Sequence, residues 1–211
     1  MAPFLTLKAQ TLATSELEIK RSRFLGYAQR CDSEEAAREF FADIRHTYPD
    51  ARHHCTAMLI DNDGQELARS SDDGEPSGTA GMPMLTAIRG SGLMNLAVVV
   101  VRYFGGIKLG TGGLVRAYSE TTSATLAEAE LVQVSSQPVF YAQLDHSAAG
   151  KFHADAQAHG VQILHVDYGS CARFTLSYDD ARAGEDLVAH LTGGQVEVTR
   201  GADRQVERPY R

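Results

Sequence analysis

The sequence predicts an α+β protein with two domains, residues 1–134 and 135–211. Segments with the two-residue alternation of strands are interspersed with segments of helical spacing, and glycine or proline marks most boundaries between them. From Val139 onward the predicted elements follow the order β-α-β-β-α-β, which is typical of a ferredoxin-like sandwich. A chain of 211 residues can bury its cores without disulfides or a structural metal.

The first half of the chain is predicted to combine strands with three helices. Residues 16–31 are expected to be extended. Ser33 is placed to cap a helix, because two acidic residues suited to a first turn follow it, and Pro49-Asp50 ends that helix at about Tyr48. The other expected elements are strands over residues 55–60, 65–70 and 95–104, a turn at 61–64, and helices over 83–89 and 112–130.

The second half has a simpler pattern, in which glycines at residues 160, 169 and 193–194 mark three of the changes of element. A joint between the domains is expected near residues 132–138, and the polar tail over residues 201–211 is expected to fray. The expected elements are strands over residues 139–144, 161–167, 172–178 and 195–199, and helices over 147–159 and 179–191.

Composition and charge exclude several classes of protein. The formal net charge of −7 is shared by both halves, so only a local basic patch would favour nucleic acid. The longest apolar run, Leu96 to Val101, is far shorter than the roughly 20 residues of a membrane span, and no secretion signal is recognisable. Cys31, Cys55 and Cys171 lack metal-site spacing and indicate free thiols. We expect a cytoplasmic protein without a cofactor or a membrane partner.

The most informative motif is a glycine-rich loop between the buried strand over residues 95–104 and the helix that follows. A helix that begins among glycines presents free backbone N–H groups at its positive end, with no Cβ to keep an anion away. The expected anion site consists of Gly110, Thr111, Gly112 and Gly113, with Lys108 and Arg116 as supporting charges. Alternatively, the glycines only permit positive φ angles and close packing. The loop is not a Walker sequence, because no Gly-Lys-Ser/Thr follows it.

Another loop, earlier in the chain over residues 71–84, carries Asp72, Asp73 and Glu75. Three carboxylates this close could hold Mg²⁺ or act as acid and base, or they could form a turn that bonds its own backbone. His53 and His54 open a strand, so their side chains point to opposite faces, and one of them could face the glycine loops. If the chain is an enzyme, the catalytic candidates are His53, His54, Asp72, Asp73 and Glu75, and the metal candidates are Asp72 and Asp73; otherwise no metal is expected.

A basic segment, Lys20-Arg21-Ser22-Arg23, precedes Phe24. Strand alternation is expected to place Arg21 and Arg23 on one face. Basic side chains interleaved with aromatic residues are the minimum for a nucleic-acid face, although a solvated sheet edge would have the same pattern. Arg102, which lies at the end of the buried strand, is a further candidate for phosphate contact.

Together, these motifs resemble the bacterial YigZ/Impact family. The matching stretches are KRSRF from Lys20, YPDARHHC from Tyr48, SDDGEPSGTAGMPM from Ser71 and VVVVRYFGGIKLGTGGLVRAY from Val98. The resemblance implies a first domain with the fold of a ribosomal-protein second domain, also found in GHMP kinases, and a ferredoxin-like second domain. It implies a link to translation, because eukaryotic relatives compete for the activator of a starvation-responsive kinase. It implies no catalytic residues, because the family has no established set.

The favoured hypothesis is a non-catalytic cytosolic factor that binds RNA or ribosomes and acts on translation. Its phosphate contacts would come from the glycine loop and from Arg21, Arg23, Arg102, Lys108 and Arg116. One alternative is an enzyme that uses the same loop for a small phosphorylated or nucleotide substrate, and another is a protein-interaction module. The candidate partners are therefore RNA or the ribosome, another protein, and a small phosphate ligand.

Overall fold

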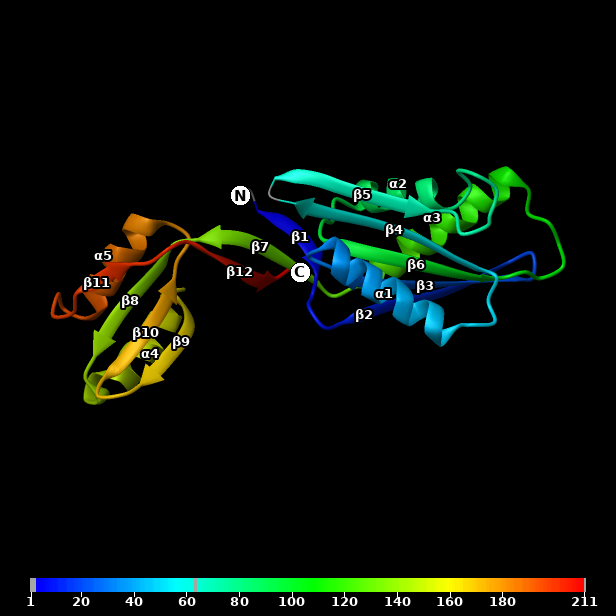
Figure 1. Ribbon diagram of the computed structural model, residues 1–211. Coiled ribbons are helices and arrows are strands. Elements are labelled where there is room, and N and C mark those ends of the chain that lie inside the picture. Colours follow the sequence, from blue (N-terminus) through cyan, green and yellow to red (C-terminus); the bar gives the residue numbers. More distant parts are fainter. Residues whose placement is uncertain (1–2, 63, 211) are drawn as a thin grey trace. The chain divides into compact units, whose positions relative to one another are not determined.

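The protein is a mixed α+β structure, as the sequence predicts (Figure 1). The computed structural model describes residues 3–62 and 64–210. They divide into two compact units, one made mainly of residues 4–134 with the C-terminal residues from 208 on, the other mainly of residues 135–207. Among the described residues, no helix combines the length and hydropathy that a membrane span requires.

The first unit is built on an antiparallel sheet of five strands in the order β2-β3-β6-β4-β5. Strand β6 lies at the centre, and all its residues from Leu96 to Arg102 are buried. A strand covered on both faces needs apolar side chains at successive positions, which explains its valine run. The five strands are β2 (Leu12–Ile19), β3 (Ser22–Arg30), β4 (His53–Asn62), β5 (Gln65–Ser71) and β6 (Leu96–Tyr103).

Helices cover both faces of this sheet. Helix α1 (Glu34–Thr47) packs on one face, and α2 (Gly81–Ser91) and α3 (Thr111–Ala127) pack on the other (Figure 1). The expected cap of α1 is confirmed, because the Ser33 hydroxyl accepts a hydrogen bond from the Ala36 N–H at 3.1 Å. Each glycine loop therefore connects a strand of the sheet, β5 or β6, to the start of a helix on the same face.

The structure differs from the extended segment predicted over residues 16–31. It has two strands, β2 and β3, joined by a tight turn at Lys20 and Arg21, which both have positive φ angles. Tight turns with positive φ angles usually contain glycine or asparagine, and this turn contains neither. The expectation that Arg21 and Arg23 lie on the same face of one strand is consequently wrong, because Arg21 belongs to the turn.

The second unit contains the predicted order of elements, β-α-β-β-α-β. Its antiparallel sheet has the strand order β11-β8-β10-β9. The core contains Phe140, Phe152 and Phe174, and the rings of the last two meet edge to face at a centroid distance of 5.0 Å. The elements are β8 (Val139–Leu144), α4 (His146–Ala158), β9 (Gln162–Tyr168), β10 (Ala172–Ser177), α5 (Ala181–Leu191) and β11 (Val198–Arg200).

Three short strands form a further sheet in the order β1-β7-β12. They are β1 (Phe4–Leu7), β7 (Leu131–Gln137) and β12 (Arg204–Pro209). Strand β7 lies where a joint is expected, and β12 lies in the tail that is expected to fray, so the expectation for the tail is wrong. The sequence pattern could not show these strands, because they are short and are formed by pairing between segments far apart in the chain.

Candidate functional site

The first glycine loop, residues 71–81, is tied to the core through Glu75. The Glu75 Oε1 atom accepts hydrogen bonds from Arg102 Nη1 at 2.6 Å and from the Tyr118 hydroxyl at 2.8 Å. The side chains of Arg102 and Glu75 are only 7% and 3% exposed. Burial raises the pKa of Tyr118, so its hydroxyl remains a donor to Glu75. The guanidinium of Arg102, expected as a phosphate contact, is therefore buried and paired with a carboxylate.

Asp72 holds the start of α2. Its carboxylate accepts hydrogen bonds from the backbone N–H groups of Gly78 at 2.7 Å and of Ala80 and Gly81 at 2.9 Å each. Burial alone would raise the pKa of Asp72, but the three N–H groups outweigh it, and the pKa lies below its usual value. The carboxylate thus supplies the negative charge that a helix N-terminus favours.

Asp73 joins the first loop to α1 and β4. Its carboxylate accepts hydrogen bonds from the His54 N–H at 2.6 Å and from Arg45 at 2.8 Å. Its carbonyl oxygen lies 2.9 Å from Nδ1 of His53. Burial opposes ionisation here as well, yet the His54 and Arg45 bonds lower the pKa of Asp73. His54 itself is buried, with Nε2 2.9 Å from the carbonyl oxygen of Tyr48.

The residues considered for catalysis therefore have structural partners. Asp72, Asp73 and Glu75 each accept hydrogen bonds from the protein, and both histidine rings lie against carbonyl oxygens. Within residues 3–62 and 64–210, no group of three or more His, Cys, Asp and Glu is arranged to hold a metal ion. The structure thus brings these residues together around the first loop as a hydrogen-bonded framework.

The second glycine loop, residues 104–110, leaves the start of α3 open. Gly110 precedes the helix with a φ of 77°, and no side chain caps the helix there. The first backbone bond runs from the Leu114 N–H to the Gly110 carbonyl at 2.9 Å. The N–H groups of Thr111, Gly112 and Gly113 precede that bond and have no acceptor among the described residues. They are donors available to a ligand.

A groove of about 590 Å³ opens at this helix start. It brings Arg116, one turn into α3, together with Lys20 from the β2–β3 turn. Lys20 is not among the phosphate contacts predicted from the sequence, although it belongs to the basic segment over residues 20–23. Glu120 places one carboxylate along the same groove. Lys108 does not line the groove, but it is exposed in the loop just before α3. The groove is lined by Ile19, Lys20, Leu109, Gly112, Gly113, Arg116, Ala117 and Glu120.

Close packing of Gly105 brings the basic hairpin to the second loop. A Cβ atom on Gly105 would lie 2.0 Å from the carbonyl carbon of Arg21, which leaves no room for a side chain. The Gly105 N–H also donates to the Ser22 hydroxyl at 3.2 Å. Two motifs about 80 residues apart in the chain therefore meet. Arg23 is less available than Arg21, because it forms an ion pair with Glu16 at 2.8 Å.

Cations without a carboxylate partner gather in this region. In the described part of the first unit, no carboxylate pairs with Lys20 or Arg21 in the turn, or with Lys108 or Arg116 around the start of α3. Many other cations of this unit do have carboxylate partners: Lys8, Arg23, Arg30, Arg38, Arg45, Arg89 and Arg102. The region therefore combines free N–H donors with four cations that form no direct ion pair among the described residues, against the single carboxylate of Glu120 in the groove.

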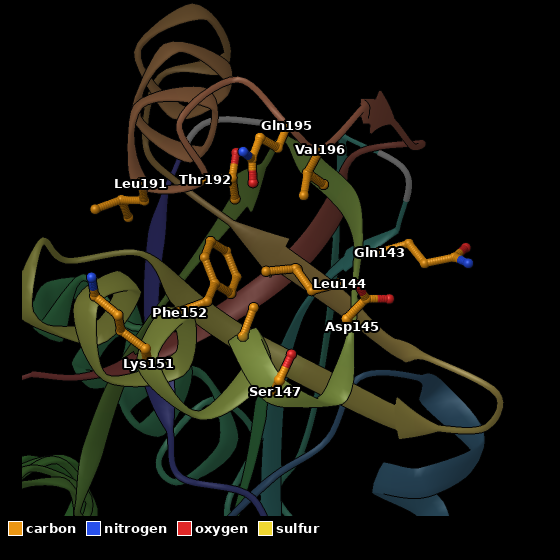
Figure 2. A pocket seen from close by; sticks show the side chains of 11 residues that line it. Gln143, Leu144, Asp145, Ser147, Lys151, Phe152, Leu191, Thr192, Gln195 and Val196 are labelled. Carbon is orange, nitrogen blue, oxygen red and sulfur yellow. The ribbon is translucent and has the colours of Figure 1, made fainter.

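The second unit has a groove of about 570 Å³ that sequence reasoning did not identify. Figure 2 shows the side chains of Phe152 and Leu144 at its centre, with Lys151 and Gln195 farther out. Lys151 is the one cation among the lining residues, which also include one carboxylate, that of Asp145. This groove lacks the collection of unpaired cations found at the start of α3.

Comparisons with known proteins agree with the resemblance carried by the motifs. The Impact N-terminal domain matches residues 20–126, about half of the chain. The chain is 32% identical over 188 residues to the IMPACT family member YvyE of Bacillus subtilis, covering 88% of this chain and 86% of the relative. It is 50% identical over 113 residues to the IMPACT family member YigZ of Escherichia coli, covering 53% of this chain and 55% of the relative.

A solved structure is similar along nearly the whole chain. A crystal structure of a hypothetical protein covers 94% of this chain and 97% of its own, with 33% sequence identity and a TM-score of 0.62. The alignments at 50% identity are shorter and span 61% and 55% of two curated relatives. The matched domain and the relatives together confirm the expected family: this chain belongs to the IMPACT family.

Proposed function

We propose that the chain is a non-catalytic cytosolic factor that binds RNA through the start of α3 and acts on translation. The observation that carries this proposal is the gathering of Lys20, Arg21, Lys108 and Arg116, without carboxylate partners, beside the free N–H groups of α3. Helix starts favour phosphate, and cations that neutralise phosphates dominate affinity for nucleic acid. Family membership supports the link to translation, because the resemblance implies that role for eukaryotic relatives.

The placement of the acidic residues favours binding over catalysis. An enzyme on a phosphorylated substrate needs acid, base or metal ligands that converge on the phosphate. Asp72 and Asp73 instead accept backbone hydrogen bonds, and neither lines the groove that contains Arg116. The open groove and its unpaired cations suit an extended polyanion, with RNA or the ribosome as the proposed partner.

The architecture suits a translation factor as well. We assign the fold of a ribosomal-protein second domain to residues 1–134 and a ferredoxin-like fold to residues 135–211. The first assignment is supported by the β2-β3-β6-β4-β5 sheet with α2 and α3 on one face. The second is supported by the β-α-β-β-α-β order and the β11-β8-β10-β9 sheet.

Salt-dependent RNA binding tests the proposed function. We expect the full chain to bind single-stranded RNA in filter assays and to sediment with ribosomes, both with an affinity that falls steeply with salt. Lys20→Gln and Arg116→Gln should each weaken binding and lower the salt slope by about one. Arg69→Gln removes the same charge from β5, at the opposite edge of the sheet from the β2–β3 hairpin, and should leave the slope unchanged. Absence of binding to RNA and to ribosomes at low salt would overturn the proposal.

A further inference from the structure

We infer that the second glycine loop binds an unpaired nucleobase of single-stranded RNA by stacking it on the ring of Phe104. The inference rests on the proposed function, because phosphate contacts at the start of α3 would hold the strand to which the base belongs. Phe104 is 55% exposed, although it lies only two residues beyond Arg102, the last buried residue of β6. A nucleobase has a flat apolar face that can cover such a ring.

The Phe104 ring is held in place from the core side. The guanidinium carbon of Arg102 lies 5.6 Å from the centroid of the Phe104 ring and 5.4 Å from that of Phe24. Arg102 is fixed by its buried ion pair with Glu75, and Phe24 is fully buried against Tyr118. The exposed ring is therefore connected to the core through a cation and a second ring. A ring ordered in advance loses little entropy when a ligand covers it.

The surroundings of Phe104 suit a nucleotide better than an uncharged apolar ligand. Gly105 and Gly106 follow directly, so neither of the next two residues places a side chain against the ring. The backbone of Arg21 touches Gly105, which brings the unpaired Lys20 and Arg21 to the same loop. The ring can thus take a base while these cations and the start of α3 take phosphates. Bases in a duplex are stacked internally, so this arrangement predicts preference for single strands.

The absence of tryptophan from the chain permits a direct test, because Phe104→Trp introduces a single indole. We expect an oligouridylate of about a dozen nucleotides to quench its fluorescence, whereas an abasic phosphodiester oligomer of equal length should bind through charge without quenching. Phe104→Leu keeps an apolar side chain but removes the ring. It should weaken oligouridylate binding about tenfold, to the affinity of the wild type for the abasic oligomer. Phe104→Tyr should retain wild-type affinity.

The controls separate stacking from general RNA binding. Leu12→Ala shortens another exposed apolar side chain, 49% exposed on β2, and should leave oligouridylate binding unchanged. Phe104→Leu should also leave duplex RNA binding unchanged. If Phe104→Leu binds oligouridylate as tightly as the wild type, stacking is overturned, while salt-dependent binding by the wild type leaves the proposed function intact. If the wild type binds neither oligomer at low salt, stacking is overturned, and the proposed function fails with it when ribosomes are not bound either.

Discussion

The two glycine loops of the first unit are both rich in glycine, but they use their polar groups in opposite ways. In the first loop, the carboxylates of Asp72, Asp73 and Glu75 are all occupied by donors of the protein itself. In the second loop, Lys108 has no carboxylate partner and the first N–H groups of α3 have no acceptor among the described residues. The start of α2 receives an anion from Asp72, whereas the start of α3 receives none.

This difference separates a structural loop from a binding loop. Both helix starts carry the same positive end of a helix dipole, so both favour an anion. The first has its anion built into the chain, which stabilises the fold and leaves nothing for a ligand. The second has cations placed around it, which suits an anion that comes from outside. The comparison therefore predicts that substitutions in the first loop affect stability and that charge substitutions in the second affect binding.

The largest expected effect is the loss of the buried ion pair beneath the first loop. Arg102→Met leaves the Glu75 carboxylate buried without its cation, and we expect the free energy of unfolding to fall by about 3–5 kcal/mol. Urea denaturation followed by circular dichroism measures this change. The double variant Arg102→Met with Glu75→Gln should lose less than the single variant, because no uncompensated charge remains. A loss of less than about 1 kcal/mol in the single variant would contradict the role of the pair.

The next largest effect is expected from adding a side chain at Gly105, where the second loop packs against the β2–β3 turn. Gly105→Ala would force a Cβ atom against the backbone of Arg21, and we expect a loss of about 1–3 kcal/mol in the free energy of unfolding. Gly112→Ala is the matched control, because nothing lies within 4 Å of the added Cβ atom. Alanine also favours the helix, so this variant should be as stable as the wild type or more stable. Equal stability of the two variants would show that the hairpin does not press on Gly105.

The smallest expected effect concerns the anion at the start of α2, and it depends on pH. Asp72→Ala removes the acceptor for three N–H groups and should cost about 1–2 kcal/mol at neutral pH. Because folding lowers the pKa of Asp72, its contribution is complete above the unfolded value of about 3.9 and is lost as the pH falls through the lower folded value. The stability difference from the wild type should therefore narrow below about pH 4. As a control, Arg116→Gln should keep the free energy of unfolding within about 0.5 kcal/mol of the wild-type value at every pH. If the stability difference between Asp72→Ala and the wild type stays constant with pH, the ionised carboxylate of Asp72 does not stabilise the start of α2.

Local patterns were sufficient to predict most elements and the two loops. Ser33 before acidic residues predicts the start of α1, and the valine run predicts β6, because both signals lie within a few residues of the element that they specify. The alternative that Asp72 forms hydrogen bonds with its own loop also relies on local chemistry, and the structure shows those bonds. The same patterns could not reveal that Arg102 is buried, because its partner Glu75 lies 27 residues away.

The sequence by itself determined that a glycine-rich segment links a buried strand to a helix start with free donors, because strand burial and helix initiation are encoded by neighbouring residues. Only the tertiary structure decided which charges surround that helix start. Pairing of β3 with β6, and the contact of Gly105 with Arg21, bring Lys20 to the groove of Arg116. The ion pair with Glu75 meanwhile withdraws Arg102 into the core. These placements arise from contacts between distant segments, for which local spacing carries no signal.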